Sequence, residues 1–501
     1  MLAAVKSAVL DGVDGRIVTV EVHVANGLPG YTVVGLPDAA GRESRERVRA
    51  ALLSSGLEYP MRRVTVNLAP ATVRKTGSGL ELAVALGLVG ASGALPPDGL
   101  GTLGVLGELG LDGRVRPVPG TLALVHALVG SGATAVIVPE ANAAEAALVP
   151  GASVRVARSL GELHACLTGT APWPDPPAPA PPDPGDAFDG TAGEPLDLDD
   201  VRGLAPARLA LAAAAAGAHH ALFVGPPGVG KTMLARRLPT IMAPLDRDEA
   251  LEVAKIHSAA ATARGGRLVT APPFRAPHHG ASAVALVGGG AARPRPGEIS
   301  LAHRGALFLD EMPEFPGPAL EALRQPLEER VVRVSRAGGA TTFPADFILV
   351  ACANPCPCGR PPDDCRCGDV QRARYARRLS APLLDRFDLR LHIARAGDAP
   401  GESSADVAAR VASAVARQRS RLGGTPWRRN AHVPAGALRI GAPLPPTAEA
   451  AWREIIEDRG LTGRGAARVR RVARTLADLD DRNDVEPADV ERACWLREDV
   501  W

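Results

Sequence analysis

The chain of 501 residues has few aromatic side chains and very few lysines. Aromatic residues make up 3% of it, and lysine stands at four positions whereas arginine stands at 53. We interpret this preference, together with the abundance of alanine, glycine and proline, as coding bias. The formal net charge of +2 is nearly balanced. Net charge therefore gives no argument for a nucleic-acid partner, which would have to be bound by local basic surfaces.

Long apolar runs and a disulfide framework are also lacking. No run of 18 or more apolar residues is free of polar interruption, so no membrane span is expected. The first apolar stretch is cut by Lys6 and Asp11, which makes it too short and too charged for a signal peptide. We therefore expect a cytoplasmic protein. Five of the seven cysteines fall between Cys352 and Cys367, and in a reducing compartment such crowding favours a metal over disulfides.

The length and the patterning predict an α/β multidomain protein with three folded regions and one spacer. Residues 1–168 contain segments of period-two alternation, such as 16–24, which indicate an α/β or α+β domain. Residues 169–198 form a proline-rich spacer, because proline lacks an N–H group and has a fixed φ. Residues 199–395 hold short, very apolar strands, which are typical of a parallel sheet covered on both faces. Residues 396–501 are predicted to be helical.

One motif carries the clearest chemistry, and it follows an apolar strand and precedes a helical stretch. Its residues fit G-x-x-x-x-G-K-[ST], and they are Gly225, Pro226, Pro227, Gly228, Val229, Gly230, Lys231 and Thr232. Glycines let backbone N–H groups turn toward phosphates. Lys231 would neutralise the β- and γ-phosphates, and the Thr232 hydroxyl would ligate Mg²⁺. The sequence therefore predicts an ATP site with Mg²⁺.

Polar side chains at the ends of two later strands are candidates for the rest of this site. Asp310 and Glu311 follow a buried strand, where Asp310 would hold Mg²⁺ and Glu311 would orient and deprotonate the attacking water. Asn354 ends another apolar strand and is a candidate γ-phosphate sensor. The alternative for Asn354 is a plain turn residue before Pro355.

Three longer segments resemble the magnesium-chelatase-like branch of AAA+ proteins, and within it the YifB/ComM group. They are residues 297–315, 274–279 and 353–359, and residues 26–29, 34–38, 42–48 and 472–478 also resemble the group. The resemblance covers nearly the whole chain. It implies a Lon-protease-like N-terminal domain, an AAA+ core and a helical C-terminal lid, assembled as a hexameric ring. For competence-associated members it also implies a DNA helicase that drives branch migration.

The same resemblance assigns roles to two arginines. Arg386, in the stretch 383–388, would be the arginine finger that reaches the γ-phosphate of a neighbouring subunit. Arg464, in the stretch 462–465, would be a lid arginine that contacts nucleotide in cis. An ordinary surface arginine is the alternative for both. One departure from the family pattern is Leu204, which stands where relatives usually carry glutamine on the adenine side.

The Lon-like domain is expected to lack peptidase activity. That chemistry needs a serine nucleophile activated by a lysine. The family's serine position falls on Gly79, with Ser78 one residue away, and its lysine position falls on Leu122. Leucine cannot act as a base, so we expect a domain for assembly or binding.

Four cysteines lie in a stretch of twelve residues rich in proline, glycine and aspartate. They are Cys356, Cys358, Cys365 and Cys367. Tetrahedral Cys₄ zinc fits this set, although C-x-C pairs are less usual than C-x₂-C. Four free thiols in an exposed loop are the alternative. Because the cluster follows Asn354 directly, a metal there would brace the loop that senses the γ-phosphate.

Residues 331–343 predict a hairpin that turns at Gly338–Gly339. In this AAA+ branch such a hairpin faces the central pore, and Arg333 and Arg336 are candidate contacts to DNA phosphates. We expect single-stranded or branched DNA as the partner. A chelatase-type motor that remodels a protein partner is the alternative. For His278 and His279, ligand, pore-loop and surface roles are all open.

Overall fold

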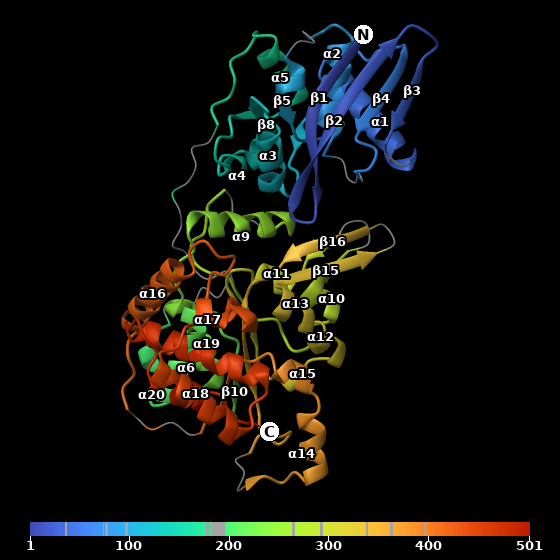
Figure 1. The fold of residues 1–501 in the computed structure, drawn as a ribbon. Helices are drawn as coiled ribbons and strands as arrows, with labels where there is room; N and C mark the ends of the chain where they lie inside the picture. The colour runs from blue at the N-terminus through green and yellow to red at the C-terminus, as the bar shows by residue number, and fades with distance from the viewer. Residues whose placement is uncertain are drawn as a thin grey trace.

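A computed structural model describes most of the chain. The described residues are 1–35, 38–73, 75, 79–95, 99–176, 181, 196–262, 266–290, 294–336, 339–360, 364–394, 397 and 399–500, without the side chains at 38–41, 336 and 339. Much of the predicted spacer 169–198, Ser78, Gly338 and the side chain of Arg336 therefore lie outside what is described. The molecule is elongated, with the N-terminal part at one end (Figure 1).

The N-terminal part is built on a mixed sheet of seven strands in the order β3-β4-β2-β1-β5-β8-β9. The strands are β1 (Leu2–Asp11), β2 (Asp14–Ala25), β3 (Gly30–Val34), β4 (Arg63–Ala69), β5 (Leu103–Val105), β8 (Ala135–Pro139) and β9 (Val154–Ala157). The main helices beside them are α1 (Asp38–Ser54), α2 (Glu81–Ala91), α3 (Thr121–Gly130), α4 (Ala143–Ala146) and α5 (Leu160–Leu167). The mixture of antiparallel and parallel pairs makes this an α+β arrangement.

The central part contains a five-stranded sheet in which every neighbouring pair is parallel. Its order is β11-β14-β17-β10-β18, with β11 (Phe274–Arg275), β14 (Ala306–Leu309), β17 (Ile348–Ala353), β10 (Ala221–Val224) and β18 (Leu389–His392). In β10, Ala221 and Phe223 pack into one core and Leu222 and Val224 into another. Both faces of the sheet are thus buried, which explains the continuous apolar strands and confirms the predicted parallel sheet. This architecture is consistent with a P-loop NTPase fold.

Helices follow the parallel sheet toward the C-terminus. They include α16 (Ser404–Arg421), α18 (Pro446–Arg459), α19 (Gly463–Leu479) and α20 (Pro487–Trp495), which gather around α6 (Ala205–Gly217) on one side of the sheet (Figure 1). The apolar face of α19 packs Val472 and Leu476 into the same core as Phe223. None of the helices in the described ranges combines the length and the apolar character that a bilayer crossing demands.

A helix between the two sheets, α9 (Arg247–Ala259), joins the N-terminal part to the rest of the chain (Figure 1). Helix α3 packs on it, and the N–H of Gly120 donates to the carbonyl of Ser258 at 3.2 Å. Leu122 is 1% exposed and lies at this contact, so the position where the resemblance puts a protease lysine is apolar and covered. A second contact joins the turn at Gly12 to Thr341.

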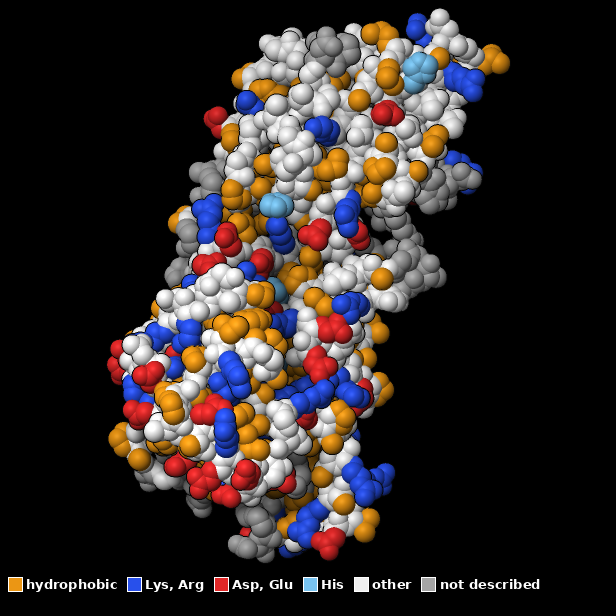
Figure 2. Space-filling model, in the orientation of Figure 1, with side chains coloured by type: hydrophobic (Ala, Val, Ile, Leu, Met, Phe, Trp, Pro, Cys, Tyr) orange, Lys and Arg blue, Asp and Glu red, His pale blue; other side chains and the backbone are white. Residues whose placement is uncertain are grey.

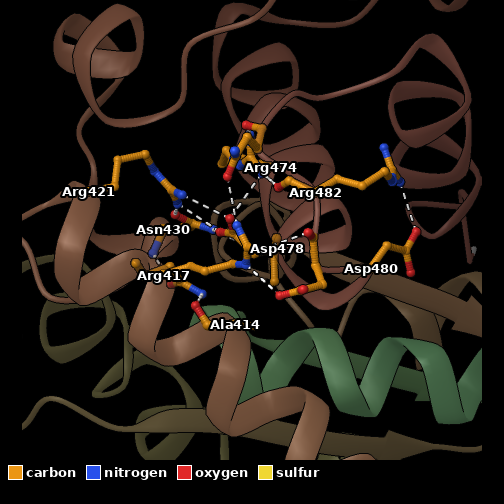
Figure 3. Close-up of polar contacts among 12 residues, drawn as sticks. Ala414, Arg417, Arg421, Asn430, Arg474, Asp478, Asp480 and Arg482 are labelled. Carbon is orange, nitrogen blue, oxygen red and sulfur yellow. Dashed lines mark hydrogen bonds and ion pairs between the residues drawn. The ribbon is translucent and has the colours of Figure 1, made fainter.

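A buried aspartate holds the C-terminal helices together (Figure 3). Asp478 of α19 is 1% exposed. Arg421 of α16 donates to both of its carboxylate oxygens at 2.8 and 2.7 Å, Asn430 Nδ2 donates at 2.9 Å, and Arg474 lies 3.0 Å away. These contacts tie α19 to α16 and to the segment between α16 and α18.

Replacing Asp478 by alanine is expected to destabilise the protein by about 3–5 kcal/mol, because Arg421 and Arg474 would lose the buried carboxylate that balances their charges and keep only neutral oxygens of Gly441, Asn430, Asn483 and Arg482 as direct partners. Equilibrium unfolding in urea measures the change. Glu402→Ala is the matched control, since Glu402 and Arg410 form an exposed ion pair at 2.8 Å. That substitution is expected to cost less than about 1 kcal/mol. If the two substitutions lowered the free energy of unfolding equally, the contacts of Asp478 with Arg421 and Arg474 would not be specially important for stability.

Candidate functional site

The predicted phosphate-binding loop lies between β10 and α7 (Lys231–Ala235), at the carboxyl end of a central strand. Gly228 and Gly230 have φ of 79° and 93°, in the left-handed region that side chains with a Cβ rarely adopt. These two glycines turn the loop so that it closes around the start of α7. Its backbone can therefore approach a phosphate closely.

Lys231 is bound to three oxygens at the mouth of this loop. Its Nζ donates to the carbonyls of Gly225 at 2.6 Å and Pro226 at 2.8 Å, and to Asn354 Oδ1 at 3.2 Å. The side chain is 8% exposed, and its burial lowers the pKa of the ammonium group, because removal from water disfavours the charge. A phosphate beside it would favour the charge instead. Asn354, the predicted γ-phosphate sensor, is thus hydrogen-bonded to Lys231, the predicted phosphate-binding residue.

The strand β14 brings the acidic pair to the same place. Thr232 Oγ1 donates to Asp310 Oδ2 at 2.8 Å, so the two predicted Mg²⁺ ligands are already in contact. A hydroxyl and a carboxylate are the hard oxygen ligands that Mg²⁺ prefers, and this donor set fits the ion. Glu311 follows with φ of 50°, an unusual value for a residue with a side chain. Strained backbone of this kind is frequent at functional positions.

These side chains surround a cavity of about 380 Å³, which lies within the usual range for small-molecule sites. Its lining residues are Pro227, Gly228, Gly230, Lys231, Thr232, Met233, Asp310, Glu311, Ala353 and Asn354. The order of the sheet explains the convergence. Strand β17 lies between β10 and β14, so the ends of all three strands meet at one edge.

His279, for which the sequence leaves ligand, pore-loop and surface roles open, lies beside Glu311 at this cavity. His279 Nδ1 is 3.7 Å from Glu311 Oε2, and both side chains are about half exposed. The ring of His278 is 4.0 Å from that of His279. No spacing rule indicates this contact, because it joins two segments that are separated by 32 positions in the chain. The structure therefore adds His279 to the surroundings of Glu311.

Arg386 and Arg464 lie together on a second, larger cavity of about 620 Å³. Five arginines line it, namely Arg330, Arg386, Arg464, Arg468 and Arg471. Arg386 has a side chain that is 9% exposed and is held by Glu328 at 2.9 Å. Arg464 is 70% exposed and lies 3.8 Å from Asp385, the residue before Arg386. Neither arginine lines the cavity around Lys231.

The four cysteines of the predicted metal site converge. Their Sγ atoms all lie within 4.8 Å of one another. The thiol of Cys358 is exposed, and backbone N–H groups of Arg360 and Arg366 donate to it and lower its pKa to about 6. The neighbouring thiol of Cys356 is buried, and its burial raises its pKa to about 12. The set of four thiols fits a thiophilic ion such as Zn²⁺.

The predicted hairpin forms from β15 (Val331–Arg336) and β16 (Gly339–Pro344). Arg333 on it is half exposed and paired with Glu329. The face in Figure 2 shows basic side chains interspersed with acidic ones over the central and C-terminal parts, and few charges over the N-terminal part. A uniformly basic surface is thus not seen on this face.

Comparison with known proteins gives matches along most of the chain. Family models described as magnesium chelatase subunit ChlI match residues 197–399 and 20–142, and a model of its C-terminal region matches residues 401–497. An uncharacterised protein of Mycobacterium tuberculosis is 46% identical over 98% of both chains. YifB of Escherichia coli is 40% identical, and the competence protein ComM of Haemophilus influenzae is 39% identical, each over 97% of this chain and 95% of the relative.

Proposed function

The chain belongs to the magnesium-chelatase-like family that includes YifB and ComM, and from this membership we propose that it is an ATP-hydrolysing ring motor acting on DNA. The observation that carries the ATPase part is the convergence of Lys231, Thr232, Asp310, Glu311 and Asn354 on one cavity. ATP is the proposed substrate and Mg²⁺ its metal, with structural Zn²⁺ in the four-cysteine cluster.

These five side chains share four tasks in the proposed reaction. Lys231 exchanges its carbonyl partners for phosphate oxygens, while Asn354, now 3.2 Å from Lys231, turns to the γ-phosphate. Thr232 and Asp310 would hold Mg²⁺, and the ion would supply positive charge to the phosphates. Glu311 accepts the proton of the attacking water.

The nucleotide site is proposed to be completed by a neighbouring chain in a homo-hexamer. Arg386 and Arg464 share one cavity, and that cavity is distinct from the one around Lys231 of the same chain. This placement favours a contact of Arg464 in trans over the contact in cis that the resemblance implies. To reach a γ-phosphate, Arg386 has to break its ion pair with Glu328. The phosphate that it would reach belongs to a neighbouring chain, so hydrolysis would depend on assembly.

The N-terminal part is proposed to be a Lon-like domain without peptidase activity. Leu122, at the lysine position, is buried against α9. An apolar residue that is covered in this way supports a role in holding the domain on the motor. Peptide cleavage by the purified chain that is lost in Ser78→Ala would overturn this assignment.

The DNA part of the proposal predicts that single-stranded and branched DNA stimulate ATP hydrolysis. Contacts to phosphates release counterions, so binding is expected to weaken steeply with salt. Steady-state ATPase rates with and without each DNA, over a series of salt concentrations, measure both effects. Stimulation by branched DNA, followed by strand exchange in a branch-migration assay, would support a ComM-like helicase.

Arg333→Ala is the variant for this test, because Arg333 is half exposed on the hairpin. If the arginine binds one DNA phosphate, its removal is expected to reduce the slope of log K against log salt by about 0.7–0.9. Arg410→Ala is the control, since Arg410 is similarly exposed and also pairs with a glutamate. The same change of slope in both variants would contradict a hairpin contact.

A chelatase-type motor that remodels a protein partner is the second candidate, and the description of the matching family models favours it. A model with the same chelatase description also matches residues 20–142 of the N-terminal part, so that part does not separate the two candidates. An active ATPase that is indifferent to every DNA tested would favour this second candidate.

A further inference from the structure

The four-cysteine cluster has the dimensions of a metal site. Three of its Sγ–Sγ distances are 3.3, 3.5 and 3.8 Å, between Cys356 and Cys358, Cys356 and Cys365, and Cys358 and Cys365. A tetrahedron with Zn–S bonds of about 2.3 Å has edges of about 3.8 Å. A disulfide would require two sulfurs at about 2.05 Å. The sulfurs are thus spaced for a shared ion rather than for a bond between any two of these three.

The loop that carries these cysteines packs on the nucleotide cavity. A methyl group added at Gly359 would lie 3.1 and 3.2 Å from Cδ and Cγ of Pro227, in the phosphate-binding loop, and 3.7 Å from Asn354 Nδ2. Gly359 is buried and has φ of 67°, and its N–H donates to the carbonyl of Cys356 at 3.0 Å. One short segment thus joins the metal ligands, the phosphate-binding loop and the sensor amide.

We propose that Zn²⁺ bound by Cys356, Cys358, Cys365 and Cys367 fixes this segment against Pro227 and Asn354, so that zinc occupancy controls the hydrolysis step. The control of hydrolysis rests on the proposed ATPase function, whereas the metal site itself does not. Binding converts four thiols and one Zn²⁺ into a tetrathiolate complex and releases up to four protons, without any change in oxidation state.

The side chain of Asn354 lies between Lys231, to which its Oδ1 is bonded, and Gly359 of the cysteine loop, which is next to its Nδ2. Burial holds one end of that loop, at Cys356 and Gly359, whereas Cys358 is exposed and Cys365 and Cys367 are half-buried. The metal would tie these three thiols to buried Cys356 and so fix the position of Gly359 over Pro227. Loss of zinc is expected to free Asn354 and the edge of the phosphate-binding loop together.

Metal analysis of protein purified without chelator tests the site itself. About one zinc per chain is expected, and the double variant Cys358→Ser/Cys367→Ser is expected to lose it. Cys494→Ser is the control, because Cys494 is a half-buried cysteine of α20 outside the cluster. Iron in place of zinc would be seen as a coloured tetrathiolate centre and would overturn the assignment to zinc. Wild-type protein without any metal would overturn the site.

Hydrogen exchange tests the link to the nucleotide cavity without relying on activity. Residues 225–230 are expected to exchange more slowly in zinc-loaded protein than in the double cysteine variant, whereas β1 and β2 are expected to exchange equally. If the wild type shows no ATPase activity but this protection is present, the proposed function fails and the metal-dependent link stands. Equal exchange of residues 225–230 in both proteins would overturn the link.

Gly359→Ala tests the same link with all four thiols intact. The added methyl group would press on Pro227, so kcat is expected to fall about 10-fold at unchanged zinc content, with the Kd of a fluorescent ATP analogue changed less than about 3-fold. Gly424→Ala is the matched control, because Gly424 has a similar φ of 78° and open space around it. A kcat equal to that of the Gly424 variant would overturn the role of this contact.

Discussion

Replacing Glu311 by glutamine is expected to lower the kcat of ATP hydrolysis by about 10²–10⁴-fold, the usual contribution of a positioned general base. The amide keeps the size of the side chain but cannot accept the proton of the attacking water. Lys231, Thr232 and Asp310 are untouched, so binding of ATP with Mg²⁺ is expected to remain. Single-turnover hydrolysis and binding of a fluorescent ATP analogue measure the two properties separately.

The chain offers a closely matched control three residues away. Glu314 is also exposed, forms an ion pair with Arg378 at 2.8 Å, and does not line the nucleotide cavity. Glu314→Gln is therefore expected to hydrolyse ATP at nearly the wild-type rate. If Glu311→Gln retained wild-type kcat, another group would have to be the base. A loss of ATP binding in Glu311→Gln would instead indicate a structural role for this side chain.

The main residues of the nucleotide site were predictable from the sequence because they follow directly after strands. Gly225 to Thr232 follow β10, Asp310 and Glu311 follow β14, and Asn354 follows β17. Side chains at the carboxyl ends of neighbouring parallel strands must lie close together, so three local patterns imply one cavity. The parallel sheet and the family are confirmed, while the catalytic roles of these residues stay predictions. The cysteine cluster was also predicted from a short stretch of sequence, and the four sulfur atoms do lie close together.

Contacts between distant segments could not be predicted in this way. The pairing of Arg386 with Glu328 and the approach of His279 to Glu311 depend on how helices and loops pack. Strand β1 was also not predicted, because its second half is buried at four consecutive residues and so lacks the alternation of a half-exposed strand. Docking of the N-terminal part on α9 has no sequence signature, since apolar residues at an interface look like those of any core.

Mixing inactive chains is expected to restore hydrolysis if the site is shared between subunits. An arginine finger contributes about 10³–10⁵-fold to kcat, so rings of Arg386→Ala alone are expected to be inactive. Rings of Lys231→Ala alone are also expected to be inactive, because the proposed contact of Lys231 with the phosphates is missing. In a mixed ring, the intact Lys231 of one chain meets the intact Arg386 of its neighbour in about a quarter of the interfaces, by random assembly into a head-to-tail ring. Recovered ATPase activity in the mixture, with mixed rings verified by native mass spectrometry, is the expected result.

Two control mixtures show whether the recovered ATPase activity comes from a shared site. The double variant Lys231→Ala/Arg386→Ala mixed with Arg386→Ala has no complete site, so it is expected to stay inactive. Arg324→Ala mixed with Lys231→Ala serves as the surface control, since Arg324 is exposed and pairs with Glu321 at 2.7 Å. Mixed rings that form but show no activity above their inactive parents would contradict a shared site.

The same mixing experiment distinguishes the two possible roles of Arg464. If Arg464 acts in cis, a chain with Arg464→Ala has an incomplete site of its own, and mixing it with Lys231→Ala restores nothing. If it acts in trans, the intact Arg464 of the Lys231→Ala chain completes the neighbour's site, and activity recovers as it does for Arg386. Because Arg464 is 70% exposed and lies on the cavity that Arg386 also lines, recovery is the expected result. Both arginines would then contact the γ-phosphate of the ATP that the neighbouring chain binds. A chain outside the ring would bind ATP without hydrolysing it.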